Sequence, residues 1–337
     1  MRTVSFHDPV SFHDLRARVE AAGLLAPRHS YYLVKIVSNL ALSALCWTAF
    51  VLVGDSWWQL PVAVALGLSF VQSGFLGHDV GHRQVSRARR ATYVLGLVHM
   101  NLLIGAAFGW WVGHHNRHHS DPNDLDRDPD TLRRQVIFDA SELPVKGRTA
   151  FRRFVIRFQP VMFFVLLGQE AWRVHVAGFQ AARAGALRRA RLELSLVVLH
   201  GVLVVGAVFL ELSPGRAVAF ILVSQTVFGF YLGAVFAPNH KGMPVYRGGE
   251  LDWLHRQVLT ARNIRPGRFV DFVYGGLNYQ IEHHLFPSLP RANLRRVRPI
   301  VRSFCAEHGI PYVEVSAWAS YREVARFLGS VSAEARA

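Results

Sequence analysis

The chain has 337 residues, of which 51% are hydrophobic, and a formal net charge of +15. A chain both this apolar and this basic must segregate the two kinds of residue along its sequence, which ordinary soluble domains seldom do. Its two cysteines, Cys46 and Cys305, exclude a disulfide framework and a four-cysteine iron–sulfur site. The N-terminal residues lack the apolar run of a signal peptide, so internal segments are expected to drive membrane insertion.

The first predicted element is a helix that Asp8 caps, that Pro9 begins and that ends near Gly23. Four apolar segments then approach the ~20 residues that a helix needs to cross a bilayer. They lie at 36–54, 57–77, 194–210 and 217–238. The short connectors of the two pairs hold no basic residue except Arg216, whereas residues 83–92 hold four and residues 113–193 hold fourteen. The positive-inside rule therefore places the long loops and both termini in the cytosol.

A fifth apolar segment, at 94–113, has basic and histidine-rich flanks on both sides. A single crossing would separate these flanks, so we expect a re-entrant or partly embedded helix packed against protein, with a true fifth span as the alternative. Residues 154–167 are too short and too basic to span and are expected to lie in the interface. A basic helix is predicted from Arg291 to about Gly309.

The predicted fold is therefore an all-α integral membrane protein with four transmembrane helices, re-entrant or interfacial helices and a cytosolic helical cap. We divide it into a cytosolic N-terminal helix (1–32), a membrane domain with the histidine groups (33–290) and cytosolic C-terminal helices (291–337). No motif for binding nucleic acid, dinucleotides or nucleotide phosphates is present.

Nine of the 17 histidines form four tight groups on the predicted cytosolic side. The groups are His78 and His82; His114, His115, His118 and His119; His240, which follows Asn239; and His283 and His284, which follow Gln280. At helical spacing, the members of a group project side by side. Eight or nine imidazoles at one membrane depth form an expensive arrangement unless something binds them, and a metal is the simplest answer.

The type and number of these ligands restrict the metal. Imidazole suits zinc, copper, iron or nickel, but a single zinc takes about four ligands, so eight imidazoles imply two ions. Two irons can activate O2 against an unactivated C–H bond, whereas redox-inert zinc would serve only hydrolysis.

The order HxxxH, HxxHH and QxxHH resembles the membrane fatty-acid desaturases. The surrounding residues are also similar: Gly77-His78-Asp79, Trp110-Trp111, Asp128-Pro129-Asp130 and the stretch from Asn278 to Pro287. The likeness runs from about residue 35 to residue 300, and it is strongest with the QxxHH subgroup, which includes bacterial acyl-CoA desaturases and front-end desaturases.

The resemblance implies roles for particular residues. The iron ligands would be His78, His82, His115, His118, His119, His240, His283 and His284. Gln280 stands where many relatives have a histidine, so it would coordinate weakly through oxygen, bond a metal-bound water or leave a position open for O2; Asn239 is the other candidate to hold such a water. Asp79, Asp128 and Glu282 are candidates to accept the free N–H of a ligating imidazole, although Asp128 could equally cap its own loop. His114 and the eight ungrouped histidines are expected to lie outside the ligand set.

The implied reaction is the O2-dependent introduction of a cis double bond into a long-chain acyl group at a centre of two iron ions. Acyl-CoA is favoured as the substrate, with acyl-lipid as the alternative. The electrons are expected from a separate ferredoxin or oxidoreductase relay, because the chain has no flavin fingerprint and no His-Pro-Gly-Gly haem signature. The expected location is a bacterial plasma membrane, in contact with membrane lipids.

Three alternatives remain open at this stage. A fatty-acid or alkane hydroxylase shares the histidine groups and differs in returning oxygen to the substrate. An intramembrane zinc hydrolase and a non-enzymatic metal or haem carrier belong to other classes. The metal content and the product would separate all of them.

Overall fold

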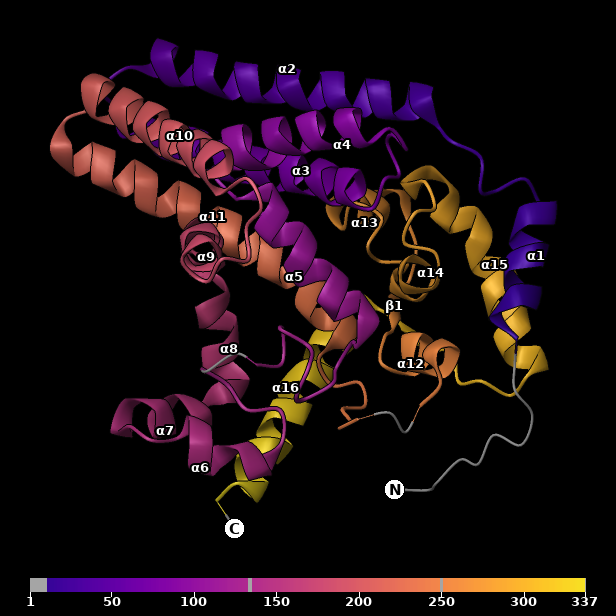
Figure 1. Cartoon of the computed structure of the whole chain (residues 1–337). Coiled ribbons are helices and arrows are strands. Elements are labelled where there is room, and N and C mark those ends of the chain that lie inside the picture. The colour runs from indigo at the N-terminus through magenta and orange to yellow at the C-terminus, as the bar shows by residue number, and fades with distance from the viewer. Residues whose placement is uncertain (1–10, 133–134, 249–250, 337) are drawn as a thin grey trace.

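The computed structural model describes residues 11–132, 135–248 and 251–336, and these are overwhelmingly helical (Figure 1). Four helices are long and apolar enough to cross a membrane: α2 (His29–Val53), α3 (Gln59–Gly81), α10 (Ala190–Glu211) and α11 (Pro214–His240). Each contains most of one predicted apolar segment and extends it. The prediction of an all-α membrane protein with four spanning helices is therefore confirmed.

The four helices form two hairpins whose turns lie at the same end of the molecule. Asp55, in the α2–α3 turn, accepts hydrogen bonds from the backbone N–H of Ser213 (2.9 Å) and from Arg216 Nη1 (2.6 Å), both near the α10–α11 turn. The exposed Trp57 and Trp58 lie at this end, where a belt of aromatic residues is expected at a membrane surface. Consequently the longer connections, which carry the histidines, all lie at the opposite end.

Helix α3 is the central helix of this bundle, and α2 lies on its outside. Of the most apolar window of α3, 61% is buried, compared with 17% for α2. Gly67 lets α3 approach α11 closely, because a Cβ atom there would lie 2.6 Å from the Ser224 carbonyl oxygen. The histidine-bearing ends of α3 and α11 are thereby held side by side.

The apolar segment at 94–113 is broken and is not one of the four candidate spans. It comprises α4 (Arg89–Gly96), a π-helical stretch η1 (Leu97–Leu102) and α5 (Phe108–Ser120), with Gly105 at φ 67° in the break. Two carbonyl oxygens freed by the break accept hydrogen bonds from neighbouring helices: Leu102 O from His200 Nδ1 (2.8 Å) and Gly105 O from His175 Nδ1 (3.0 Å). Backbone that leaves a helix at membrane depth requires such partners.

The start of α5 is capped by residues from outside that helix. The N–H of Phe108 donates to Asn101 Oδ1 (3.1 Å), and the N–H of Gly109 donates to Glu193 Oε2 (2.7 Å) on α10. A carboxylate is favoured at this position because the first N–H groups of a helix have no partner within it. The direction of α5, which carries four histidines, is therefore fixed by α10.

The remaining elements surround the histidine-bearing end of the bundle. They are α1 (Phe12–Ala21), η2 (Ala140–Glu142), α6 (Leu143–Lys146), α7 (Ala150–Arg157), α8 (Gln159–Leu167), α9 (Glu170–Arg183), α12 (Trp253–Leu259), α13 (Arg268–Val273), α14 (Gln280–Leu285), α15 (Arg291–Glu307) and α16 (Ala317–Glu334). Two short strands, β1 (Asn263–Ile264) and β2 (Glu314–Val315), pair in parallel, with Asn263 opposite Glu314.

Four of these elements bear on the predictions. Residues 154–167 are not among the candidate spans, as expected; they are divided between α7, which ends at Arg157, and α8, where Pro160 lies in the first turn and its missing N–H is tolerated. Their position in the interface stays a prediction. The N-terminal helix ends as predicted, with Gly23 at φ 66°, but Asp8 and Pro9 lie outside the described residues. The basic helix α15 occupies the range expected for it.

The terminal helices pack on the elements that carry the site. Leu15 and Val19 of α1 share a hydrophobic cluster with Phe304 of α15 and Ile281 of α14. At the other end of the chain, Leu328 of α16 packs in a cluster with residues of α8. The three segments defined from the sequence are therefore joined by common hydrophobic cores.

Gly105→Ala is expected to destabilise the protein. The positive φ costs an L-residue roughly 1–2 kcal/mol, and the new Cβ would lie 2.5 Å from His200 Cδ2. The midpoint of thermal unfolding should fall by at least about 2–4 °C. Gly206→Ala on α10 is the matched control, because a Cβ there meets no atom within 4 Å. Equal midpoints for the two variants would contradict this account of the break.

Candidate metal centre

Four segments bring the grouped histidines to one place. His78 and His82 lie at the end of α3, the second group lies on the last two turns of α5, His240 ends α11, and the last pair lies on the short helix α14. In Figure 1, the ends of α5 and α11 converge beside α14. Residues more than 200 positions apart in the chain thus meet in one buried cluster.

The histidines form two sets. His78, His82, His115 and His283 each offer a ligand atom within 4.8 Å of the others, and so do His118, His240 and His284. His119 lies between the sets: its Nε2 is 3.1 Å from His115 Nε2, and its ring stacks on that of His284 with centroids 4.2 Å apart. All eight predicted ligands are therefore adjacent.

The second set presents three imidazole lone pairs to one point. His118 Nδ1 donates to Asp128 (3.0 Å), His240 Nδ1 donates to the Thr260 carbonyl (3.1 Å) and His284 Nδ1 donates to Gln257 Oε1 (2.9 Å). Once Nδ1 carries the proton, Nε2 of a neutral imidazole is an acceptor only. Nevertheless His118 Nε2 and His240 Nε2 face each other at 3.3 Å. Acceptors do not approach in this way without a cation, so this set fits a metal ion.

The first set shows the same deficit. His78 Nδ1 is 3.2 Å from Asp79 Oδ1, which leaves its Nε2 as an acceptor 3.2 Å from His283 Nε2. The buried Nε2 of His82, like that of His284, has no hydrogen-bond partner among the described residues. A buried polar atom without a partner costs about 1–3 kcal/mol. Both sets therefore fit a metal ion, and the neighbouring sets fit two.

Most imidazoles of this cluster are held in the neutral form that metals bind. Burial, followed by the charges of neighbouring imidazoles, lowers the pKa of His115, His119, His283 and His284 well below its ordinary value. A neutral imidazole keeps one lone pair free for a metal. At His118, burial lowers the pKa, but the Asp128 carboxylate outweighs burial and the pKa is raised.

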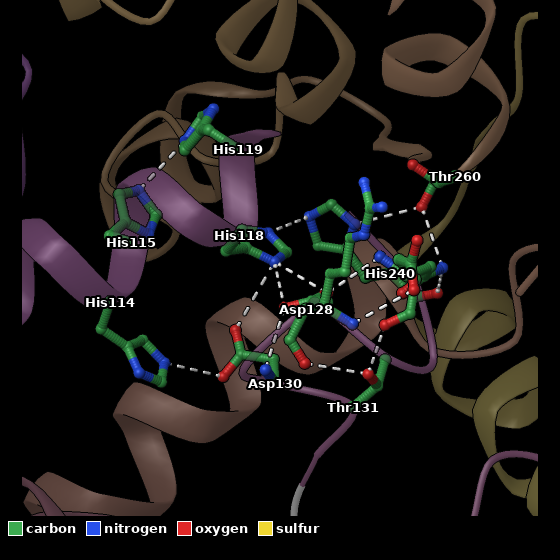
Figure 2. A network of polar contacts seen from close by, with 12 residues as sticks. His114, His115, His118, His119, Asp128, Asp130, Thr131, His240 and Thr260 are labelled. Atoms are coloured by element: carbon green, nitrogen blue, oxygen red, sulfur yellow. Dashed lines mark hydrogen bonds and ion pairs between the residues drawn. The ribbon is translucent and has the colours of Figure 1, made fainter. Parts of the chain in front are cut away.

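Asp128 orients His118 and organises its own loop (Figure 2). Besides accepting from His118, its carboxylate accepts the backbone N–H groups of Asn123 (2.8 Å) and Asp130 (2.9 Å). Asp128 therefore makes both kinds of contact expected from the sequence: it accepts a hydrogen bond from a grouped imidazole, and it accepts hydrogen bonds from the backbone of its own loop. Burial raises the pKa of this carboxyl, but His118 outweighs that effect and the pKa is lowered.

Asp79 connects His78 to the C-terminal part of the chain. Its second oxygen is 2.7 Å from Arg291 Nη2, and Arg291 also donates to the Phe75 carbonyl (2.7 Å). An imidazole, a carboxylate and a guanidinium therefore form a buried chain. From the sequence, Arg291 is predicted only to begin a basic helix, and that pattern does not identify Asp79 as its partner.

Gln257 and Thr260 are orienting residues that the sequence did not reveal. Gln257 Nε2 donates to the His119 carbonyl (3.0 Å), which turns its Oε1 toward His284. Thr260 acts through its backbone carbonyl, so no side-chain pattern could have identified it. Both come from the segment around α12, which has no histidine group of its own.

Gln280 and Asn239 are adjacent at the edge of the second set. Asn239 Nδ2 donates to Gln280 Oε1 (3.2 Å), and Gln280 Nε2 lies 2.9 Å from His240 Nε2. Gln280 therefore turns its NH2 group toward the histidines and its oxygen toward Asn239. The Asn239 Oδ1 atom is buried and has no partner among the described residues.

Glu282 lies away from the imidazole nitrogens. Its carboxylate accepts from Asn263 Nδ2 (2.7 Å) and from the Tyr312 hydroxyl (2.7 Å) instead of from a histidine. Contrary to the expectation, Glu282 therefore does not accept a hydrogen bond from any ligating imidazole that the structure describes. Burial raises the pKa of Glu282 to about 7, against the lowering effect of these two hydrogen bonds.

His114 belongs to neither set, although it lines the cavity beside the first set. Its Nε2 is 3.2 Å from Asp130 Oδ1, and Figure 2 marks this contact. Among the ungrouped histidines, His175 and His200 bond the broken backbone, and His308 donates to the Phe304 carbonyl (2.8 Å). His7 lies outside the described residues.

A small cavity adjoins the first set. It has a volume of about 90 Å³, and its walls include His78, His115, Trp111, Met100 and Phe236. Glu170 and Arg173, which form an ion pair (2.7 Å), line both this cavity and a groove of about 580 Å³ between α8 and α9. This ion pair therefore lies between the groove and the cavity beside the histidines.

Comparison with known proteins agrees with this site. The family model described as fatty acid desaturase matches residues 55–316. An acyl-lipid (9-3)-desaturase of Physcomitrium patens is 32% identical, over 90% of this chain and 59% of that protein. A Delta(6)-fatty-acid desaturase of Caenorhabditis elegans is 31% identical over 90% and 70%, and a Delta(8)-fatty-acid desaturase of Arabidopsis thaliana is 31% identical over 83% and 65%. The chain thus spans less than two thirds of the Physcomitrium and Arabidopsis proteins.

Asp128→Asn is expected to weaken metal binding about 10- to 100-fold, because the neutral amide orients and polarises His118 less strongly than the carboxylate does. Metal per chain, measured by mass spectrometry after dialysis against a graded chelator, would reveal the loss. The control is Asp126→Asn in the same loop, whose side chain is 57% exposed and pairs with Arg247. Similar retention in the two variants would refute the role given to Asp128.

Proposed function

We propose, given that the chain belongs to the fatty acid desaturase family, that it introduces a cis double bond into a long-chain acyl group with the consumption of O2. The observation that carries this proposal is the pair of histidine sets, with their converging lone pairs, beside an apolar cavity. The cavity beside the histidines is lined by apolar side chains such as Met100, Ile104 and Phe236, with Asp130, Glu170 and Arg173 as its charged members. The apolar side chains support an acyl substrate rather than the polar substrate of a hydrolase.

The proposed cofactor is two iron ions, held by the seven histidines of the two sets and by His119 between them. When bound, they would supply the reduction of O2 and the oxidising power needed to remove hydrogen from an acyl methylene. The chain's own residues orient the ligands: Asp79 and Asp128 act through carboxylates, and Gln257 acts through its amide. Asn239 and Gln280 are proposed to hold a water molecule or O2 at the edge of the second set.

The cavity is proposed to bind the acyl methylenes and exclude water from them. Trp111 packs on the His115 ring with centroids 4.5 Å apart, so the cavity wall and a proposed ligand form one rigid unit. The groove between α8 and α9 would hold the part of the substrate nearer its carboxyl end. The Glu170–Arg173 pair lies at the junction of the two spaces and would have to let the chain pass.

The position of insertion is proposed to be counted from the carboxyl end, as in front-end desaturases. Gln280 at the head of the last histidine group supports this, and the names of the Caenorhabditis and Arabidopsis relatives specify Delta(6) and Delta(8) positions. The sequence favoured acyl-CoA as the substrate, whereas the Physcomitrium relative is named for acyl-lipid. The two carriers present the same acyl group, and supplying each of them to the purified enzyme would distinguish them.

The active site is proposed to face the cytosol of a bacterial plasma membrane, and a ferredoxin or an oxidoreductase relay is proposed as the electron donor. The basic residues at the histidine-bearing end support this orientation, because both hairpin turns lie at the other end. Acidic redox proteins would be attracted to such a surface.

The direct test is to express the chain with a ferredoxin and its reductase and to profile cellular fatty acids by mass spectrometry. We expect new unsaturated acids and about two irons per chain, and His118→Ala should reduce product at least ~100-fold through loss of metal. Hydroxylated products would support the hydroxylase alternative instead. One zinc per chain and an unchanged profile would overturn the proposal.

Gly74→Leu should restrict the length of acyl chain that the enzyme accepts. Gly74 lines the small cavity, and a leucine there would fill space that the end of a long chain needs. We expect products of the shorter substrates to be retained and those of the longest to fall about tenfold, as for the loss of one or two methylene contacts. Gly74→Ala is the control, since its Cβ would lie 3.8 Å from Ile104. An unchanged chain-length profile in Gly74→Leu would show that the acyl chain of the substrate does not bind in this cavity.

A further inference from the structure

A basic cleft lies on the face of α5 that is turned away from the metal centre. It has a volume of about 510 Å³ and is bounded by α4, α5, the α9–α10 loop and the first turn of α10. Phe108, Gly109 and Val112 of α5 line it, whereas Trp110, Trp111 and His115 line the cavity beside the histidines. The two spaces share no lining residue and are separated by α5.

Four arginines surround this cleft: Arg83, Arg89, Arg188 and Arg189. Arg83, Arg89 and Arg188 form no ion pair or side-chain hydrogen bond with any residue that the structure describes, and Arg189 lies over the Tyr93 ring at 4.7 Å. The one acidic side chain in the cleft is Glu193, which is 2% exposed and already accepts the Gly109 N–H. The guanidinium groups of Arg83, Arg89 and Arg188 are therefore available to an anion.

Arg83 adopts a backbone conformation that arginine does not favour. Its φ is 58°, and it occupies the position after the end of α3 where the Gln84 N–H bonds the Asp79 carbonyl and the Arg83 N–H bonds the Val80 carbonyl. Glycine is the usual residue at this position of a Schellman motif, because it has no Cβ to strain. Backbone strain that is retained at a position open to glycine points to a role for the side chain.

The position of the cleft relative to the bilayer indicates which class of ligand it can bind. It includes the first turn of α10, a candidate spanning helix, so it lies at the boundary between membrane and water. Its floor is apolar, with Phe108, Val112 and Leu187, whereas its rim is cationic. The positive-inside tendency explains basic residues at this end, but it explains neither their convergence on one cleft nor the strain at Arg83.

We propose that this cleft binds the headgroup phosphate of an anionic phospholipid, with the glycerol end of the lipid on the apolar floor. Guanidinium groups bind phosphate through paired, charge-assisted hydrogen bonds, and the cytosolic leaflet supplies anionic lipid at this depth. The bound lipid would contact α5, whose opposite face carries the proposed metal ligands.

The test measures binding of dihexanoyl phosphatidylglycerol to the detergent-solubilised full chain by calorimetry, with dihexanoyl phosphatidylcholine as the neutral probe. We expect the anionic lipid to bind more tightly. The double variant Arg83→Gly/Arg188→Gln should weaken it about tenfold, whereas Arg302→Gln/Arg322→Gln, with the same loss of charge on exposed parts of α15 and α16, should not. Arg83→Gly alone should unfold at an equal or higher temperature, which shows that the weaker binding is not misfolding.

Several results would overturn the proposal. These are equal affinity for the two lipids, equal weakening in the two double variants, and unchanged binding in Arg83→Gly/Arg188→Gln. Inorganic phosphate or free CoA that binds as tightly as the phosphatidylglycerol, and competes with it, would identify a soluble ligand and would also overturn the assignment to a lipid.

Discussion

The structure depends on imidazole lone pairs that converge in a buried site, where the Gln280 amide beside His240 Nε2 cannot partner all of them. In the second set, His118, His240 and His284 each give their Nδ1 proton to an oxygen, so each Nε2 is left as an acceptor near the other two. Such convergence is unfavourable without a cation and favourable with one. Much of the fold around the site positions the oxygen atoms that accept these Nδ1 protons.

Those oxygens come from segments that do not carry the histidines, and this explains the architecture of the histidine-bearing end. The loop after α5 supplies Asp128, the segment after α11 supplies Gln257 and Thr260, and Arg291 of α15 holds Asp79 in place. The bundle sets only the depth and the direction of α3 and α11. Precision at the site is therefore contributed by α12, by α15 and by the loops after α5 and α12.

The spans and the histidine groups could be predicted because each depends on residue type and local spacing. The apolar segments predict α2, α3, α10 and α11, and the spacing in His78-Asp-Val-Gly-His82 places two imidazoles on one helical face. The break at Gly105 could not be predicted, since it depends on His175 and His200 arriving from other helices. Glu282 was assigned by its nearness in sequence to His283, yet the helical turn directs it to Asn263 and Tyr312. The partition into two sets is likewise a tertiary property.

The short pairing of β1 with β2 has a topological effect much larger than its two residue pairs. It joins Asn263 to Glu314 and so closes a loop that contains α13, α14 and α15. Within that loop, Asn263 bonds both the Ile281 N–H (2.9 Å) and Glu282, and Tyr312 bonds Glu282 from the other end. The last two proposed ligands are therefore held by a cyclic segment, whose closure limits how far His283 and His284 can separate from the membrane bundle even when no metal is bound.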